Sequence, residues 1–596
     1  MRSPWFGFLL IAILLARIAQ GADSDRARAE QFLRLVNSSY QSLYRIQSEA
    51  QWLASTDVTA AHDSARLTAD KAFNAFTGNP ELIREARFLL EGRDRLTDLQ
   101  RRQLERLLLL AAEGPMTQPD LVSRRLAAET AQASVLNGFQ FQLRGSNVIA
   151  NDLDRILSQS TDLSDRRAAW EASKLTGPAL RPGLVQLQEL RNGVARELGH
   201  SNYFALQTAA YGLSAEEMIR LNDAFLRELR PLYLQLHTWA KYTLAKKYGQ
   251  PVPNRIPAHW LNNRWAQEWG GLVAAASLDR FFTNRTAESI TKTAEQFYIG
   301  LGFQPLPESF WKKSDLFPVP NGESRLKNSH ASCWHVDLDR DIRSLMSVES
   351  NPWWFYTAHH ELGHGYYFMA YSRPEVPALL RAGANPAFHE GIGEQISLAA
   401  GQVPYLKQVG ILPSNYEEDP IATLLETALS HAIPFLFWAS GTMTHWEYDL
   451  YAQQLSPSEW NARWWKYVAE FQGVEPPQGP GSRGEEFCDP ATKTHINDNP
   501  AYYYSYAIAT VQKFQIHDYI ARNILHQPPQ SCNYAGNRAV GDYLRKILEP
   551  GATRDWRQLL REATGEDLST RAMKAYFEPL QKWLEQQNAG RPIGWK

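Results

Sequence analysis

We predict an all-α fold, a single large helical domain with very little β-structure, from three observations. Apolar residues recur at helical spacing through most of the chain. Alternating strands around Asn-Gly or Asp-Gly turns, the usual sign of hairpins, are scarce. No repeat of fixed period and no low-complexity linker interrupts the 596 residues. One domain is therefore favoured over two independent ones.

The composition is that of a globular protein. The chain is 44% hydrophobic and 21% charged, which excludes disordered, collagen-like, coiled-coil and multi-span membrane proteins. A net charge of −2 with no Lys/Arg-rich run argues against a nucleic-acid partner. The 19 Trp, 25 Tyr and 25 Phe indicate a thickly packed interior or an aromatic-lined cleft. Three Cys cannot form a disulfide framework, so stability must come from packing.

The first 21 residues are predicted to be a signal peptide. Arg2 gives a positive start, residues 5–16 are nearly all apolar, and Ala19-Gln20-Gly21 offers small residues for cleavage. The alternative, an uncleaved membrane anchor, is less favoured because the apolar stretch is short for a bilayer. We expect residues 22–596 to form an exported protein, periplasmic or secreted. No stable membrane association is expected after cleavage.

The first clear helix signal lies near residue 100. Thr97 with Gln100 matches a capping box, and Gly114-Pro115 would stop the helix. The apolar residues between these signals follow helical spacing: Leu104, Leu107, Leu108 and Ala111.

Two further helices are defined by their ends. Gly199 suits the position just past a helix end, after the apolar run of the first of them. Asn351-Pro352 suits a helix start and Arg373-Pro374 an end, so a helix is predicted between them. The apolar positions before Gly199 are Leu187, Leu190, Val194 and Leu198.

The helix predicted after residue 351 carries a His-Glu-x-x-His motif. His360 and His364 lie one turn apart, so both imidazoles can bind one metal ion. Glu361 is rotated by about 100° from His360, beside the metal, where it can take a proton from bound water. The alternative is two surface histidines on an amphipathic helix. The motif favours a zinc enzyme with one Zn²⁺ per chain.

The third zinc ligand is expected near residue 390. The extended motif of the metzincins fails, because Tyr367 and Ala370 stand at the positions of its Gly and His. Glu390 and Glu394 are one turn apart in a further helical run. One of them can ligate zinc while the other accepts a hydrogen bond from a ligand imidazole. Two histidines and one carboxylate leave a coordination position open for water, which is typical of hydrolytic zinc.

Together with segments on both sides of the motif, these residues closely resemble the angiotensin-converting-enzyme family of zinc peptidyl-dipeptidases. The resemblance covers essentially the whole chain after the signal peptide and is weak before about residue 200. It implies a zincin-type helical domain divided by a deep active-site cleft. The segments that carry it are His359 to His364, Arg381 to Glu394, Ile256 to Trp260, Trp265 to Trp269, His330-Ala331-Ser332, Lys493 to Ile496, Tyr503 to Tyr506 and Phe514 to His517.

The resemblance implies roles for residues far from the zinc motif. Glu361 would be the general base, and His495 and Tyr506 would donate hydrogen bonds to the oxyanion. The metal ligands would be His360, His364 and Glu390, with Glu394 behind them. The backbone of Ala331 would pair with an extended substrate. The substrate-binding residues would be Gln267, His330, Ala331, Lys493 and Tyr503.

A terminal-carboxylate anchor would make the enzyme a peptidyl-dipeptidase. Lys493, Gln267 and Tyr503 would hold the C-terminus of an oligopeptide, and two extended residues span about 7 Å from there to the zinc. Single-residue carboxypeptidases of the family carry arginine at the position of Gln267, so Gln267 favours dipeptide release. Taken singly, Lys493 could be a solvated loop lysine and Gln267 a satisfied core amide.

The sequence departs from the family pattern at several positions. Glu394 replaces a shorter Asp, and Trp353-Trp354 replace acidic residues before the zinc helix, so subsite preferences cannot be carried over. The animal enzymes' disulfide cysteines are missing, apart from Cys532 near one of them, which lacks its partner, and this fits a bacterial exported protein better. Cys333 and Cys488 flank two segments of the same cleft, so a disulfide between them is possible.

Chloride is not expected to be required. The animal relatives bind an activating chloride through the arginine of a Tyr-x-Arg-Tyr element, where this chain has Ser505. At the position of a second chloride-binding arginine stands Val468. Burying an anion without a cationic partner is costly.

Two rival functions remain. A zinc oligopeptidase, aminopeptidase or carboxypeptidase of similar fold would keep the metal site but not need an anchor for a dipeptide's carboxylate. A non-catalytic peptide-binding homologue would be expected to lose a ligand or Glu361, whereas all these positions are filled.

Overall fold

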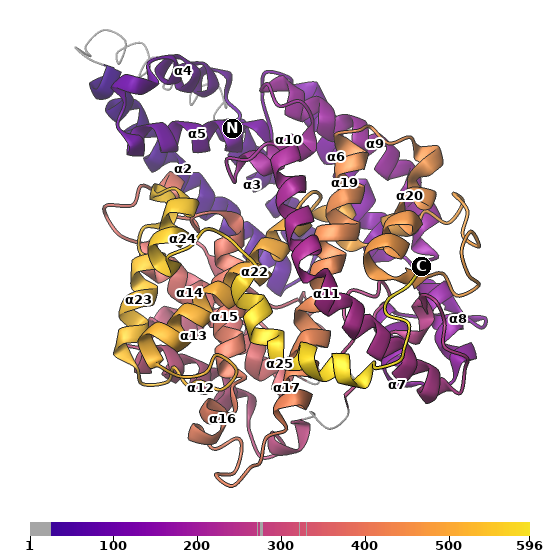
Figure 1. Ribbon diagram of the computed structural model, residues 1–596. Helices are drawn as coiled ribbons and strands as arrows, with labels where there is room; N and C mark the ends of the chain where they lie inside the picture. Colours follow the sequence, from indigo (N-terminus) through magenta and orange to yellow (C-terminus); the bar gives the residue numbers. More distant parts are fainter. Residues whose placement is uncertain (1–24, 271, 274–277, 321, 329) are drawn as a thin grey trace.

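Helices dominate the computed structural model, which describes residues 25–270, 272–273, 278–320, 322–328 and 330–596 (Figure 1). The strands among these residues form three two-stranded ladders. The prediction of an all-α fold with very little β-structure is therefore confirmed. The predicted signal peptide, residues 1–21, lies outside the described residues.

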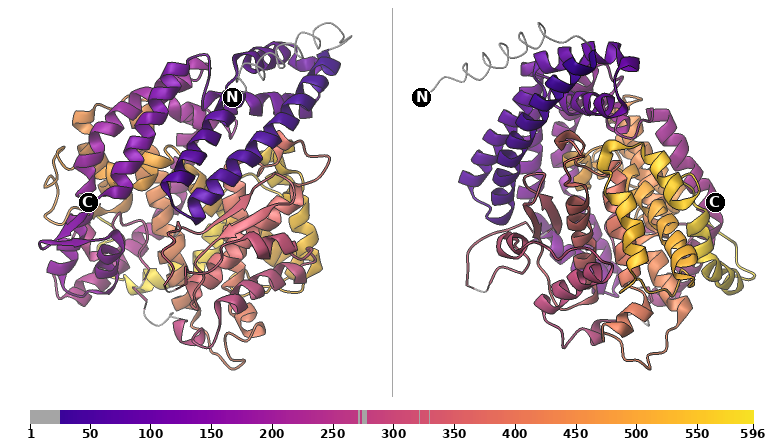
Figure 2. Two further views of the ribbon diagram at one scale, coloured as in Figure 1. Left: turned by 180° about the vertical axis from the view of Figure 1, so that it is seen from behind. Right: turned by 90° about the vertical axis from the view of Figure 1, so that its left-hand side faces the viewer.

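The N-terminal helices form a layer of their own at one end of the molecule (Figure 2). The predicted capping box begins α5: Thr97 accepts from the Gln100 amide, and the Gln100 side chain accepts from the Thr97 amide. The small core of this layer also takes in Leu338, Ala378 and Leu379, which fix it to the rest of the chain. The helices of this layer are α2 (Asp25–Thr56), α3 (Ala60–Thr77), α4 (Pro80–Glu91) and α5 (Asp98–Ala112). The next helix, α6 (Pro119–Gly138), packs instead on α9 (Thr176–Glu197).

The middle of the chain supplies the longest helix. It is α11, which begins at a capping box of Ser214 and Glu217 and ends at Gly249, whose φ of +63° suits glycine. As predicted, α9 ends just before Gly199, with φ +94°. The helices here are α7 (Ala150–Gln159), α8 (Leu163–Ser173), α9 (Thr176–Glu197), α10 (Tyr203–Ala209), α11 (Ala215–Tyr248), α12 (Ala287–Gly300) and α13 (Glu308–Lys313).

The remaining helices carry most of the predicted site. The predicted helix with the His-Glu-x-x-His motif is α14, capped by Asn351 and ending at Tyr371. These helices are α14 (Pro352–Tyr371), α15 (Pro386–Ala400), α16 (Val403–Gln408), α17 (Pro420–His431), α18 (Ile433–Leu436), α19 (Thr444–Tyr451), α20 (Trp460–Tyr467), α21 (Thr494–Asp498), α22 (Tyr503–Tyr519), α23 (Arg538–Leu548), α24 (Trp556–Thr564) and α25 (Arg571–Gln587).

The three ladders are short, and one lies beside the zinc motif. In it, β4 (Ser332–His335) pairs antiparallel with β5 (Ile342–Leu345), and β4 packs against α14. The others join β1 (Phe141–Leu143) to β2 (Ser146–Val148) and, in parallel, β3 (Ile256–Pro257) to β6 (Val474–Glu475).

Two large hydrophobic cores meet at α15 and α22, which pack on each other. On α15, Ala387 belongs to one core and Phe388 to the other. On α22, Tyr503 and Phe514 lie in the first core, and Ile516 lies in the second. The two helices therefore belong to both cores, and each packs against apolar side chains of the two cores.

One apolar segment of the described residues, Pro420–Tyr451, is long enough to cross a membrane by length and composition alone. In this fold, 65% of its most apolar window is buried inside the protein. It contributes Leu429, Phe437 and Trp438 to the larger core, so packing accounts for its hydrophobicity.

The possible disulfide between Cys333 and Cys488 is wrong, because all three cysteines are free. Cys333 lies on β4, against Gly365 of α14. Cys488 is buried in the larger core, and its backbone packs on Gly177 of α9. The two thiols therefore lie in different parts of the fold.

Candidate functional site

The His-Glu-x-x-His helix presents two imidazoles to one point. The side chain of Asn351 accepts from the Trp354 amide and so caps the start of α14. One turn separates His360 from His364, and their Nε2 atoms are 3.1 Å apart. This geometry follows from helical spacing, as the sequence predicts.

Glycines allow α15 to approach α14 closely enough to add a carboxylate. A Cβ on Gly363 would lie 3.3 Å from the Cα of Gly393, and one on Gly393 would lie 3.1 Å from the His360 ring. Larger residues would separate the helices. With glycine at both positions, Glu390 Oε2 lies 3.6 Å from His360 Nε2.

The three predicted ligands fit a zinc ion. One ligand atom from each of His360, His364 and Glu390 falls within 4.8 Å of the others. Two nitrogen ligands of a tetrahedral zinc lie about 3.3 Å apart, close to the observed 3.1 Å. Two imidazole nitrogens and a carboxylate oxygen are the donor set that zinc hydrolases use. These residues could hold a metal.

Glu361 is buried beside this cluster and its Oε2 has no hydrogen-bond partner among the described residues. Burial raises the pKa of Glu361 to about 7, against the opposing effect of His360. Burial by itself would lower the pKa of His360, but the charges of Glu361, Glu394 and Glu390 raise it. A buried carboxylate with an unpaired oxygen next to a ligand set is typical of a functional group rather than a structural one.

Of the two candidate glutamates, Glu394 lies behind the ligands. Its Oε1 is 3.8 Å from His360 Nδ1, the nitrogen that faces away from His364. Its Oε2 accepts from the Lys513 ammonium at 2.9 Å. A carboxylate on the outer nitrogen of a ligand imidazole orients the ring. Sequence reasoning missed Lys513, although it lies seven residues after Tyr506 and hence on the same helix face.

A second cluster gathers residues that are far apart in sequence. The Lys493 ammonium donates to Gln267 Oε1 at 2.8 Å and lies 4.3 Å from the centre of the Trp265 ring. It also lies 5.4 Å from the centre of the Tyr503 ring. Lys493 is only 5% exposed, and burial lowers its pKa to about 7. The three predicted anchor residues are thus adjacent, with Trp265 as a further member that the sequence analysis did not assign.

Between the two clusters lie His495 and Tyr506. The Tyr506 hydroxyl is 3.5 Å from His495 Nε2, and its ring packs on those of Tyr502 and Tyr503. Burial raises the pKa of Tyr506, with the Glu390 charge adding to it. Burial, with Lys493 next in effect, lowers the pKa of His495 to about 3. Both groups are therefore neutral at pH 7 and able to donate hydrogen bonds.

The predicted residues His330 and Ala331 lie just before β4. His330 is exposed and close enough to His495 for their charges to interact. Half-buried Ala331 precedes β4, which among the described residues pairs only with β5. On the same strand, burial and then the charge of Glu361 raise the pKa of Cys333. Cys333 of β4 is therefore close to Glu361, and His330, just before β4, is close to His495.

The chain is similar to known proteins over nearly its whole length. A family model described as angiotensin-converting enzyme (Peptidase_M2) matches residues 23–595. The chain is 28% identical over 630 residues to the angiotensin-converting enzyme-related protein of Drosophila melanogaster, covering 98% of this chain and 96% of that protein. It is 28% identical to the angiotensin-converting enzyme of Mesocricetus auratus over 612 residues, and 30% identical to that of Bos taurus over 469. These matches cover 44% and 35% of the two mammalian proteins, so the chain spans less than half of their length.

Proposed function

The chain belongs to the angiotensin-converting enzyme family of metallopeptidases, and we propose that it is a zinc-dependent peptidyl-dipeptidase acting on oligopeptides with a free C-terminus. The observation that carries the proposal is the buried ammonium of Lys493, held by Gln267 next to Tyr503, Tyr506 and His495. Among the residues that the structure describes, no carboxylate is in hydrogen-bond contact with this ammonium. Such a buried cation suits a ligand that brings its own negative charge.

His360, His364 and Glu390 would hold the zinc, with Glu394 and Lys513 fixing the ring of His360 from behind. Zinc, when bound, supplies a Lewis acid that polarises the scissile carbonyl and makes water more acidic. The unpaired Oε2 of Glu361 takes the proton of the attacking water and later delivers it to the leaving amine.

The oxyanion that forms during attack would be stabilised by His495 and Tyr506. Thr494 Oγ1 lies 3.3 Å from His495 Nδ1, so a hydrogen bond donated by that hydroxyl leaves the proton on Nε2. Nε2–H of His495 and the hydroxyl of Tyr506 then point to the same region, 3.5 Å apart. Both donors are pre-placed by the aromatic packing of Tyr502 and Tyr503.

The substrate would lie extended along the site. Its backbone would pair with the edge of β4 at Ala331, and its terminal carboxylate would meet Lys493, Gln267 and Tyr503. An anchor about 7 Å from the cleaved bond leaves room for two residues. The Gln267 side chain accepts a hydrogen bond from Lys493 and would thus belong to this anchor.

We also propose that the enzyme is exported and works without chloride. Ser505, at the position of the relatives' chloride-binding arginine, is buried and accepts a hydrogen bond from the Tyr211 hydroxyl at 2.8 Å. Val468, at the second such position, is buried in the larger core. Two neutral, packed side chains support a site in which Tyr506 is held by packing.

The test compares one hexapeptide with a free and an amidated C-terminus by mass spectrometry. The proposal expects sequential loss of dipeptides from the free acid and little cleavage of the amide. A zinc oligopeptidase would cleave both alike, a carboxypeptidase would release single residues, and a binding protein would release nothing. Zinc-loaded Glu361→Gln serves as the control for contaminating peptidases.

A further inference from the structure

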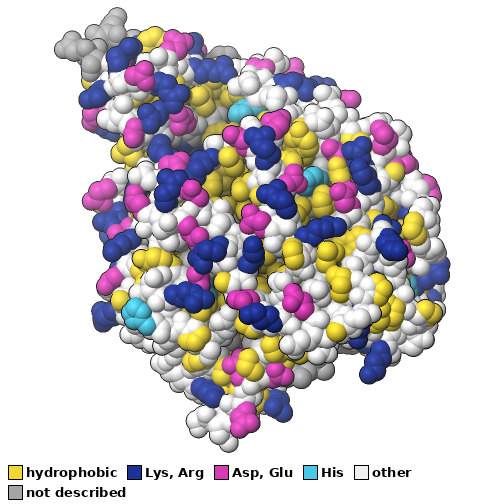
Figure 3. Space-filling model, in the orientation of Figure 1, with side chains coloured by type: hydrophobic (Ala, Val, Ile, Leu, Met, Phe, Trp, Pro, Cys, Tyr) yellow, Lys and Arg dark blue, Asp and Glu magenta, His cyan; other side chains and the backbone are white. Residues whose placement is uncertain are grey.

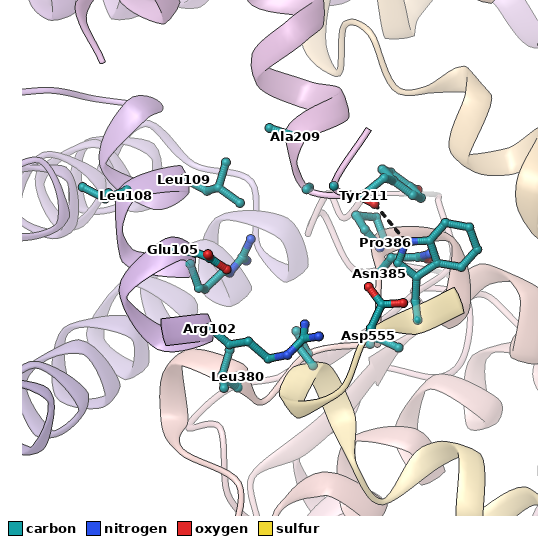
Figure 4. Close-up of a pocket in the computed structure, with 18 of the residues that line it drawn as sticks. Arg102, Glu105, Leu108, Leu109, Ala209, Tyr211, Leu380, Asn385, Pro386 and Asp555 are labelled. Atoms are coloured by element: carbon teal, nitrogen blue, oxygen red, sulfur yellow. Dashed lines mark hydrogen bonds between the residues drawn. The ribbon is translucent and has the colours of Figure 1, made fainter. Parts of the chain in front are cut away.

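A cavity opens under the N-terminal layer. It has a volume of about 850 Å³, and its walls come from α5, from the chain between α10 and α11, from the segment before α15 and from the start of α24. Figure 3 shows the surface hollowed between the N-terminal helices and the body beneath them. Figure 4 shows Leu108 and Leu109 on one side of this cavity, and Tyr211 and Pro386 on the other.

The cavity reaches the zinc-side residues but not the terminal anchor. His389 and Tyr502 line it. The Nδ1 atom of His389 is 3.3 Å from that of His364, and the Tyr502 ring packs on Tyr506 at 5.2 Å. None of the described anchor residues, Lys493, Gln267 and Tyr503, lines it. A peptide held at Lys493 and cleaved beside Tyr506 would therefore continue into this cavity with its N-terminal part.

The lining is strongly positive. Five arginines and only two carboxylates, Glu105 and Asp555, contribute to it. Glu105 lies 3.4 Å from Arg93, and Asp555 lies 3.5 Å from Arg557, which is outside the lining. The arginines are Arg87, Arg93, Arg101, Arg102 and Arg106.

Two of these arginines have no partner among the residues that the structure describes. Arg102 and Arg106 lie one turn apart on α5, both are half-buried, and neither makes an ion pair or a hydrogen bond there. Figure 4 shows Arg102 extending from α5 into the cavity, on the side of Asp555. Arg106 faces Tyr40 and Tyr44, whose hydroxyls remain neutral at pH 7. Half-buried guanidinium groups without anions are ready to bind carboxylates.

We propose that this cavity binds the N-terminal part of substrates and selects Asp or Glu side chains several residues before the cleaved bond, through Arg102 and Arg106. The inference rests on the proposed peptidyl-dipeptidase function. Because both guanidinium groups stay partly solvated, one contact should raise kcat/KM by about twofold to fivefold. The effect should weaken as salt is added.

The test uses octapeptides with a free C-terminus that carry Asp or Asn at one position, scanned from two to five residues before the cleaved bond. The wild type should release the first dipeptide from the best Asp peptide about twofold to fivefold faster than from its Asn twin. Arg102→Gln/Arg106→Gln should remove this preference, and Arg102→Glu/Arg106→Glu should reverse it, so that the Asn peptide is cleaved faster than its Asp twin. Arg66→Gln, an exposed arginine on α3 outside the cavity, is the matched control and should keep it.

A tripeptide blocked at its N-terminus has no residues to place in the cavity, and all folded variants should cleave it alike. If no protein releases dipeptides even from this substrate, the proposed function fails. If dipeptides are released but wild type treats Asp and Asn peptides equally at every position, only the present inference is overturned. A preference that survives both double variants would likewise overturn it. Direct binding of the Asp and Asn peptides to Glu361→Gln should show the same ratio without turnover.

Discussion

The zinc side of the site comes from two successive helices, whereas the terminal anchor comes from segments far apart in the chain. His360, His364 and Glu390 lie on α14 and α15 and are brought together by helical spacing and two glycines. Lys493 and Gln267 are 226 residues apart and meet only through the packing of the larger core. The proposed metal ligands are therefore locally encoded, while the proposed substrate anchor depends on the whole fold.

The two sides also differ in charge. Three glutamates, Glu361, Glu390 and Glu394, surround the histidines, as suits a cation. The anchor presents the ammonium of Lys493, whose nearest polar partner is a neutral amide. Tyr506 stands between these regions. Changes on the zinc side should therefore affect all substrates, and changes at the anchor only those with a free C-terminus.

The largest effect is expected from Glu361→Gln. Loss of the general base should lower kcat by about 10² to 10⁴ for free-acid and amidated peptides alike. The zinc content should stay normal, because Glu361 is not a ligand, and metal analysis of the purified variant checks this. His364→Ala, in contrast, should lose metal. Near-normal turnover by zinc-loaded Glu361→Gln would contradict the assigned role.

Tyr506→Phe should rank next. Removing one oxyanion donor should lower kcat by about 10² to 10³ with little change in KM. Tyr502→Phe is the matched control, since the Tyr502 ring packs on the ring of Tyr506 but lines the cavity under the N-terminal layer. A rise in KM with unchanged kcat would instead place Tyr506 among the groups that bind the ground state.

Lys493→Ala should distinguish the effect of the anchor from the effect of the zinc side. A charge-assisted contact contributes about 1.5–3 kcal/mol, so kcat/KM for free-acid peptides should fall by about 10- to 100-fold. Any residual cleavage of amidated peptides should change much less. Lys466→Ala, an exposed lysine on α20, serves as the control. Equal losses for both kinds of peptide would show that Lys493 does not recognise the terminus.

The preference for free acids should also depend on pH. Burial lowers the pKa of Lys493 to about 7, so the free enzyme carries the charge below pH 7 and loses it above. The ratio of kcat/KM for free-acid over amidated peptide should thus be highest near pH 6 and fall by up to about tenfold per unit above pH 7. A ratio that is flat from pH 6 to 9 in wild type would refute this dependence.

The smallest effect is expected from chloride. Titrating chloride into acetate buffer at fixed ionic strength should leave kcat/KM unchanged, because Ser505 and Val468 offer no cation. A saturable increase of several-fold would point to a cation elsewhere that positions Tyr506.

The sequence determined the zinc side almost completely. The cap at Asn351, the end of α14 before Arg373 and the facing imidazoles all follow from contacts within one or two turns of a helix. Such contacts depend on the spacing of a few neighbouring residues, and the helix has a single geometry. The end of α9 at Gly199 was predictable for the same reason.

Only the tertiary structure decided how separate elements meet. It brought the Lys513 ammonium to the carboxylate of Glu394 and kept Cys333 and Cys488 apart. It also placed Arg102 in the lining of a cavity that His389 lines as well. None of these relations has a spacing that sequence reasoning can use, because the two partners lie on different elements. Their distance is set by how α14, α15, α22 and the N-terminal layer pack, which depends on the shapes of many buried side chains at once.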